Sequence, residues 1–236
     1  MMNPIRKLIP FAALLLIQKQ LETHKLLEFE WVAHNRTRAL QNGLDNSLLA
    51  LTTLRDHVVA SGGVEAEGFR VFAESLLERY QGLESLMWVA LPKGSGQVKP
   101  FAVTQVIPAQ AVGDGPGFDL VSNPRFIQTL SRARDQRRTA ASGRIPYSLP
   151  GKGSEYGFVV ASPVIDHQRP VPRFKQPEQG ISGFVVGFFG IGNLANHAIS
   201  LLEPRGVEIL ILDETAPAEE RFLHFYASRL SPRRIE

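Results

Sequence analysis

The segment Gly190-Ile191-Gly192-Asn193-Leu194-Ala195 comes nearest to a chemical motif by residue type and spacing. It follows an apolar run, opens a predicted helix and precedes a strand that ends at Asp213. This order matches the dinucleotide fingerprint, in which glycines let backbone approach a pyrophosphate at a helix N-terminus. Only 23 residues follow Asp213, too few for the further strand–helix units of that fold. We therefore favour an ordinary strand-to-helix turn and keep a nicotinamide-dinucleotide-binding oxidoreductase as an alternative.

Other catalytic patterns are missing from the sequence. The absence of cysteine excludes disulfides, thiolate metal sites and cysteine nucleophiles. The histidines form no H-E-x-x-H pair, and there is no G-x-S-x-G elbow. Gly151-Lys152 is followed by Gly153, so it is no phosphate loop. The sequence predicts neither an enzyme nor a cofactor or metal site.

The composition is that of a globular chain with little net charge. Of the 236 residues, 44% are hydrophobic and 21% are charged, and the formal net charge is +3. These values are ordinary for a protein that buries a core. One cluster of cations lies at a predicted helix end: Arg132, Arg134, Arg137 and Arg138. Cations there complement the helix macrodipole, and no aromatic residues interleave with them, so we expect no nucleic-acid surface.

The first 17 residues carry a targeting pattern. Arg6 and Lys7 precede a nearly continuous apolar run, Leu8–Ile17. A basic flank before a short apolar run is typical of a signal sequence, whereas a bilayer crossing needs about 20 apolar residues. We interpret residues 1–17 as a truncated signal anchor with its N-terminus in the cytoplasm. The apolar start of a soluble helix is the alternative.

Residues 18–82 predict a stalk helix followed by a second helix. The first runs from 18 to 60, without proline, and would be about 60 Å long at 1.5 Å per residue. Its apolar stripe contains Leu40, Leu44, Leu48, Leu51, Leu54 and Val58. That stripe is either a dimer seam or a surface that packs on the second helix of the same chain. The second helix has an apolar face of its own: Phe69, Phe72, Ala73, Leu76, Leu77 and Tyr80.

Short apolar runs separated by turn residues then predict strands. We expect strands at residues 86–91, 101–107, 140–147, 156–165, 181–189, 207–212 and 222–230. Helices are expected at 124–134, where Asn123 is the N-cap and Pro124 the first helical residue, and at 193–202. The proline-containing stretch 166–180 predicts a linker. Residues 83–168 and 169–236 thus form two successive small α/β units.

Several segments, taken in order, carry a resemblance that covers roughly residues 25–230. They are Phe29-Glu30-Trp31-Val32-Ala33 with Arg36 and Arg38, Phe69-Arg70-Val71-Phe72, Gly82-Leu83-Glu84-Ser85-Leu86-Met87-Trp88, Gly117-Phe118-Asp119-Leu120-Val121-Ser122, Pro124-Arg125, Ala133-Arg134-Asp135, Ser162-Pro163-Val164-Ile165 and Gly183-Phe184-Val185-Val186-Gly187. Together they resemble the CHASE domain, the extracellular sensory module of receptor histidine kinases and nucleotide cyclases.

The resemblance implies an α+β fold in which a long stalk helix carries two PAS-like subdomains with antiparallel sheets, usually as a dimer between two membrane spans. It makes residues 83–168 the membrane-distal, ligand-binding subdomain and residues 169–236 the membrane-proximal one. In plant members the ligand is a cytokinin, and an aspartate holds its adenine. The matching position falls near Gln110, whose amide can also hydrogen-bond a purine edge. A threonine of plant members corresponds to Ser142.

We therefore predict an extracytoplasmic sensor that binds a small molecule, with adenine-like compounds among the candidates. The sensor would signal to a cytoplasmic output domain, either a histidine kinase or a diguanylate cyclase/phosphodiesterase. We expect a homodimer through the stalk, tethered to the inner membrane with the sensor facing the periplasm or extracellular side. The candidate ligand-binding residues combine aromatic walls with polar groups: Trp88, Phe101, Thr104, Gln110, Ser142, Arg144 and Tyr147. A ligand-free adhesion or assembly module is the remaining alternative.

Overall fold

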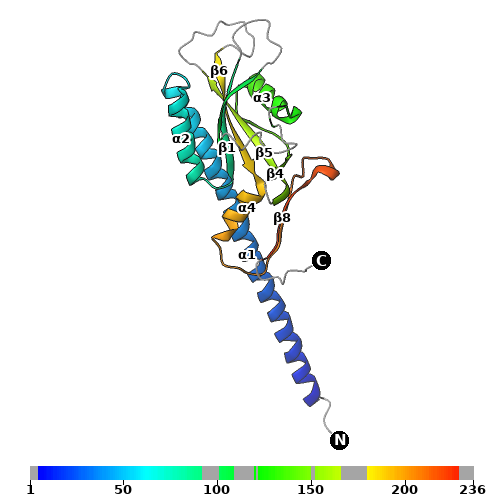
Figure 1. The fold of residues 1–236 in the computed structure, drawn as a ribbon. Helices are drawn as coiled ribbons and strands as arrows, with labels where there is room; N and C mark the ends of the chain where they lie inside the picture. The colour runs from blue at the N-terminus through cyan, green and yellow to red at the C-terminus, as the bar shows by residue number, and fades with distance from the viewer. Residues whose placement is uncertain are drawn as a thin grey trace.

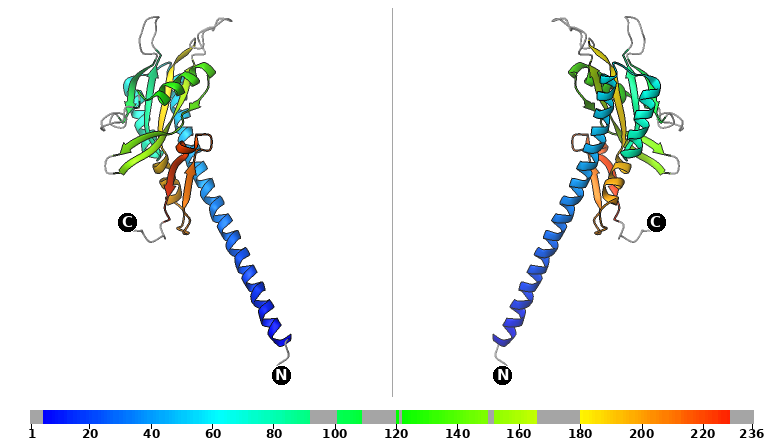
Figure 2. Two further views of the ribbon diagram at one scale, coloured as in Figure 1. Left: turned by 90° about the vertical axis from the view of Figure 1, so that its right-hand side faces the viewer. Right: turned by 90° about the vertical axis from the view of Figure 1, so that its left-hand side faces the viewer.

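The computed structural model describes residues 5–91, 101–108, 120, 122–149, 152–165 and 180–228, with side chains from Lys19 onward except those of residues 149, 152 and 153. A long helix, α1 (Ile5–Ala60), carries a head of sheets and shorter helices at its C-terminal end (Figures 1 and 2). At 1.5 Å per residue its 56 residues span about 84 Å. Residues 19–31 are exposed throughout, so this section of the helix projects from the head as a stalk.

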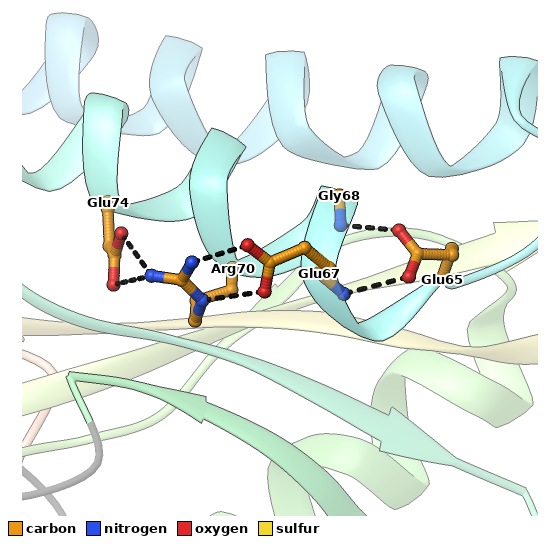
Figure 3. A network of polar contacts seen from close by, with 5 residues as sticks. All are labelled: Glu65, Glu67, Gly68, Arg70 and Glu74. Atoms are coloured by element: carbon orange, nitrogen blue, oxygen red, sulfur yellow. Dashed lines mark hydrogen bonds and ion pairs between the residues drawn. The ribbon is translucent and has the colours of Figure 1, made fainter.

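The two N-terminal helices end where the sequence places stop signals. After α1, Gly62 adopts a φ of 70°, a left-handed conformation that glycine takes without steric cost. Helix α2 (Ala66–Arg79) then runs back beside α1 (Figure 1). The Glu65 carboxylate caps α2 by accepting hydrogen bonds from the Glu67 and Gly68 amides (Figure 3).

Eight strands in the described residues form a large and a small sheet. The large sheet contains β1 (Leu83–Ala90), β2 (Ala102–Ile107), β3 (Ala140–Ala141), β4 (Ile145–Leu149), β5 (Lys152–Ile165) and β6 (Ile181–Gly190). Its order is β2-β1-β6-β5-β3, with β4 also on β5, and each of its pairs is antiparallel. The small sheet pairs β7 (Ile209–Leu212) with β8 (Phe222–Tyr226), also antiparallel.

Strand β6, which follows the predicted division between residues 168 and 169, shares one sheet with strands that precede it. It pairs with β1 on one side and with β5 on the other, so it is the central strand of the large sheet. Apart from the exposed Ser182, its apolar and glycine residues are all buried, as expected for a strand covered on both faces. After Gly190 the chain continues through α4 (Ile191–Ser200), β7, the short helix η2 (Ala218–Glu220) and β8.

Helices α1 and α2 cover one face of the large sheet. We call this the helix layer; its buried residues are Ala50, Leu51, Leu54, Val58, Phe69, Ala73, Leu76, Leu83, Leu86, Trp88, Ile107, Val160, Val164, Val185 and Phe189. The upper part of the predicted stalk stripe thus packs within its own chain, the second of the two options that the sequence left open. Leu51 and Val58 are 2% exposed each, so neither can contribute to a dimer seam without unpacking this core.

Helix α3 (Pro124–Gln136) covers the opposite face. The predicted N-cap is confirmed, since the Asn123 side chain accepts a hydrogen bond from the Arg125 amide and Pro124 opens the helix. We call this face the α3 layer; its buried residues are Met87, Val89, Phe101, Leu120, Phe126, Leu130, Ala133, Ala140, Ile145, Tyr147, Val159, Ala161, Ile181, Phe184, Val186 and Phe188.

Candidate functional site

The large sheet has two ends that matter for a binding site. At the distal end β1 and β5 finish and β2 and β6 begin, with Ala90 paired to Gly183 and Ile165 to Ile181. At the base β6 passes directly into α4, and Gly190 pairs with Gly157. Figure 1 shows the distal end pointing away from the N-terminus of the stalk and the base pointing toward it.

An aromatic and cationic group stands at the distal end of the α3 layer. The ring of Phe101 lies 5.8 Å from that of Phe184 in an edge-to-face arrangement. The guanidinium carbon of Arg134, on α3, lies 5.9 Å from the centroid of Phe101. Arg134 also donates to the Asp135 carboxylate at 2.9 Å. A side chain held in this way can offer both a flat apolar surface and a charged donor to a ligand.

Arg134 was not among the residues predicted to bind ligand. The sequence suggested a solvated arginine, because Arg134 belongs to a cluster of cations at a predicted helix end, where they complement the helix macrodipole. The helical spacing held a usable signal: Phe126, Leu130 and Ala133 all turn toward the sheet. Arg134 follows directly on Ala133, which places its stem at the border of the buried face.

Three of the predicted ligand-binding residues, Phe101, Tyr147 and Trp88, lie apart from one another. They differ either in the face of the sheet or in the end of the sheet at which they lie. Phe101 and Tyr147 both belong to the α3 layer, but Tyr147 packs edge-to-face on Phe188, four residues further along β6 than Phe184. Four residues of strand span about 13 Å. Trp88 faces the helix layer instead, because its neighbours Met87 and Val89 take the α3 side and side chains alternate along a strand.

The other predicted residues serve local or bridging contacts. Thr104 is exposed on the edge strand β2. The Ser142 hydroxyl accepts from the Val159 amide and donates to the Gly143 carbonyl, which fixes the turn before β4. Gln110 lies outside the described residues. The structure therefore brings these candidates together less closely than the sequence suggested, and only Phe101 stands at the distal end of the α3 layer.

Arg144 connects the large sheet to the small one. Its guanidinium donates to the carbonyls of Phe222 and Glu219 at 2.7 and 3.0 Å and lies 4.5 Å from the centre of the Tyr156 ring. Arg125 acts beside it: it donates to the Arg144 carbonyl and pairs with the Glu220 carboxylate at 2.6 Å. These two arginines hold the turn that leads into β8 against the α3 side of the head.

A polar junction occupies the base of the large sheet. It consists of Glu84 on β1, Tyr147 on β4, Glu155 on β5, Asn193 on α4 and His224 on β8. The Asn193 amide donates to Glu84 at 2.6 Å, and the Tyr147 hydroxyl donates to Glu155 at 3.2 Å. Burial, followed by the negative charges of Glu84 and Glu155, raises the pKa of Tyr147, which keeps its hydroxyl protonated as a donor.

The junction also settles the dinucleotide hypothesis, which is wrong. A dinucleotide site requires parallel strands with the glycine turn at their carboxyl edge, whereas β6 pairs antiparallel with both neighbours. A Cβ on Gly190 would collide with the Glu84 carboxylate and the Tyr147 hydroxyl. The space in front of the helix N-terminus is thus filled by side chains, two of them acidic, and not open to a pyrophosphate.

A groove of about 480 Å³ borders this junction on the outside. It lies between the turn from α2 to β1 and one side of α4, and Glu84 and Asn193 belong to both the groove and the junction. Its other polar lining comes from Gln81, Asn196, His197 and Ser200. Within the described residues, no three His, Asp or Glu side chains are arranged to hold a metal ion.

Comparison with known proteins now identifies the fold. A family model described as the CHASE domain matches residues 92–224, more than half of the 236 residues. The chain belongs to the CHASE domain family. The resemblance predicted from the sequence is confirmed, as are the long N-terminal helix and the antiparallel sheets. CHASE domains are extracytoplasmic sensor modules that are not themselves catalytic.

A solved structure similar to this CHASE domain is the ligand-binding domain of the Pseudomonas aeruginosa PAO1 amino acid chemoreceptor PctC in complex with GABA. The two share 16% sequence identity, with 83% of this chain and 75% of that chain covered and a TM-score of 0.48. A search of curated proteins finds no match. In the described part of the CHASE domain chain, no helix has the length and apolarity to span a bilayer.

Proposed function

We propose that this CHASE domain senses a small molecule at the distal end of its α3 layer and passes the signal down the stalk helix. The observation that carries the proposal is family membership together with the Phe101–Arg134 pair, which lies where two strands end and two begin. Strand ends are where connecting segments gather, and binding residues are found on such segments more often than in regular elements.

The ligand that this group would suit has a flat or apolar body and a hydrogen-bond acceptor or negative charge. The body would lie near Phe101, and the acceptor would meet the guanidinium of Arg134. An adenine-like molecule remains a candidate, with Gln110 as the predicted partner of its edge. The proposed binding set is therefore Phe101, Arg134 and Gln110. The other residues predicted from the sequence do not converge on this end of the layer.

A direct mechanical route leads from this end to the stalk. Strand β6 crosses the whole sheet and continues without a break into α4. Helix α4 lies against α1, where a Cβ on Gly43 would come 3.2 Å from that of Ala198. The Arg36 guanidinium, buried on α1, donates to the Glu203 carbonyl at 2.6 Å just beyond α4. A ligand that binds two arrangements of β6 with different affinity would thereby shift α4 against the stalk.

We further propose that the receptor is a homodimer, tethered to the inner membrane and joined through the lower stalk. The sensor would face the periplasm or the extracellular side and control a cytoplasmic kinase or a cyclase/phosphodiesterase. Residues 19–31 make few contacts with the head yet carry large exposed apolar side chains: Leu21, Leu26, Leu27, Phe29 and Trp31. An isolated helix of this kind is marginal in water, and pairing would bury these side chains.

Isothermal titration of the chain against adenine derivatives, amino acids and organic acids tests the sensor proposal. We expect one class to bind, and Arg134→Gln to weaken it by about tenfold or more, because hydrogen bonds to charged groups contribute roughly 1.5–3 kcal/mol. Phe101→Leu should weaken the same ligand. Arg138→Gln, on an exposed arginine beyond α3, is the matched control and should bind like the parent. A folded chain that binds none of these compounds, or equal affinity in all variants, would contradict the proposal.

A further inference from the structure

The polar junction at the base contains one buried ring nitrogen that the fold leaves without a partner. His224 lies on β8, on the face of the small sheet that turns toward α4, and its Nε2 is fully buried with no hydrogen-bond partner among the described residues. A buried polar atom without a partner costs free energy, so its presence in a packed interface needs an explanation.

The ring is pressed into its position by close neighbours. A Cβ on Gly192 would lie 3.2 Å from the His224 Nδ1 and 3.0 Å from a Glu155 carboxylate oxygen, so the imidazole and the carboxylate meet at the first turn of α4. Gly192 itself is buried. The absence of a side chain at residue 192 is what lets β8 approach both α4 and β5.

Several described elements contribute charged, polar or apolar groups near His224. The carboxylate nearest the ring in the junction is that of Glu155 on β5. It also accepts a hydrogen bond from the Tyr147 hydroxyl on β4. Glu84 of β1 lies one step further, bonded to Asn193 of α4. The partner across β7 is the apolar Ile211. Along β8 itself, Arg144 donates to the Phe222 carbonyl two residues away.

We propose that His224 is a pH-sensitive latch: its neutral ring keeps the small sheet docked on α4 and β5, and acidification releases it. Release is favoured because solvent can protonate both ring nitrogens of an undocked histidine, whereas docking places Nε2 where its proton would find no acceptor. The groove that borders Glu84 and Asn193 opens this junction toward water. The inference does not depend on the ligand proposed for the distal end.

The direction of the pH dependence follows from the surroundings of the ring. Burial lowers the pKa of His224 below its ordinary value, and the charge of Glu155 opposes that shift. The undocked state therefore binds more protons than the docked state at pH values below about 6.5 and above the lowered pKa. Docking is fully stable above this window and weakens as the pH falls through it. Each unit by which the pKa is lowered corresponds to about tenfold more opening.

The latch would add a second input to the sensor. The small sheet lies against α4, and α4 lies against α1 just above the exposed stalk, as Figure 2 shows (β7 and β8 in orange and red). Loosening β8 removes one of the contacts that hold α4 in place. External pH would thus act at the base of the head, while the proposed small molecule acts at its distal end.

Hydrogen exchange of the β7 and β8 amides in the full chain, compared at about pH 7.5 and about pH 5.5 after correction for intrinsic rates, tests the latch. We expect protection in both strands to be lost progressively in acid while protection in β6 stays constant. NMR titration of the ring proton on Cε1 should give His224 a pKa below the ordinary histidine value of about 6.5.

His224→Gln should remove the acid-induced loss of protection, and His197→Gln, on the exposed side of α4, should leave it intact. If His224→Gln fails to dock at any pH, His224→Phe keeps a ring of similar shape without a titrating nitrogen and takes its place. Glu155→Gln should deepen the acid effect, because it removes the charge that favours the protonated ring. A His224 pKa at or above the ordinary value of about 6.5, or equal acid sensitivity in His224→Phe and the parent, would overturn the proposal.

Discussion

Each face of the large sheet carries a cluster of buried apolar side chains, but different helices cover the two faces. The helix layer is covered by α1 and α2, which precede the sheet in sequence and run along it (Figure 1). The α3 layer is covered by a helix of 13 residues, α3, which lies in sequence between β2 and β3 of the same sheet. The first cover includes α1, which continues into the stalk, whereas α3 is joined in sequence to strands of the sheet on both sides. For this reason we propose that ligand sensing takes place on the α3 side of the sheet and signal transmission on the side of the helix layer.

The largest effects should come from Phe184 and Phe189, two of the three phenylalanines of β6, one on each face of the sheet. Phe184 packs in the α3 layer and Phe189 in the helix layer, and both are fully buried. Replacing either by alanine should lower the free energy of unfolding by about 3–5 kcal/mol, because a cavity remains where the ring was. Urea denaturation measures both losses.

Phe184 and Phe189 also allow the two faces of the sheet to be compared for ligand binding. Phe184 touches Phe101, whereas Phe189 stacks on Phe158 with ring centroids 5.0 Å apart. In the milder variants Phe184→Leu and Phe189→Leu, which keep more of the core, only the first should weaken a ligand found by titration. Equal weakening by both would mean that the two faces do not divide their roles as we propose.

A smaller loss is expected where β6 passes under Trp88. A Cβ on Gly183 would lie 2.6 Å from the Val89 carbonyl oxygen and press on the indole of Trp88. Gly183→Ala should therefore destabilise the head by about 1–3 kcal/mol through overpacking. Gly143→Ala is the control, since a Cβ there meets only the Arg125 guanidinium at 3.6 Å. Thermal unfolding that is equally affected by both changes would show that Gly183 has room to spare.

The smallest effect belongs to the outer surface of the helix layer. Arg70 on α2 pairs with Glu67 and Glu74 at 2.5 and 2.9 Å, and all three side chains are largely exposed (Figure 3). Exposed pairs contribute little and are screened by salt, so Arg70→Gln should shift the midpoint of thermal unfolding slightly at low salt and not at high salt.

The stabilisation contributed by the Arg70–Glu67 pair should decrease in acid. The hydrogen bond from Arg70 lowers the pKa of Glu67, so its contribution is present above the unfolded value and disappears as the pH falls through the lowered one. Melting curves of the Arg70→Gln variant and the parent should therefore converge in acid. A difference that persists there, or grows with salt, would point to lost packing of the arginine stem rather than lost charge.

Much of the secondary structure was predictable from local patterns. Strand β5 was expected at 156–165 and begins at Lys152, and the helix expected at 124–134 is α3, cap included. Alternation, apolar runs and capping residues act over a few neighbours, so a sequence displays them directly. The family resemblance was visible for the same reason, because its segments keep their order along the chain.

Other features depended on which distant residues meet. The linker at 166–180 suggested a domain boundary, yet β6 returns to the centre of the sheet because its apolar run needs neighbours on both edges. Trp88 on β1 and Phe101 just before β2 fell on opposite faces of the sheet, and no local pattern indicated which face either side chain would take.

Sequence alone therefore determined the elements, their order and the family of this protein, because helix periodicity, strand patterns and caps are local. Tertiary structure alone decided that the upper part of the stalk stripe packs inside the head, that Gly190 and Gly192 lie against carboxylates, and that Glu84, Glu155 and His224 share one junction. Those side chains come from three different strands, and only the folding of the chain brings them within contact of one another.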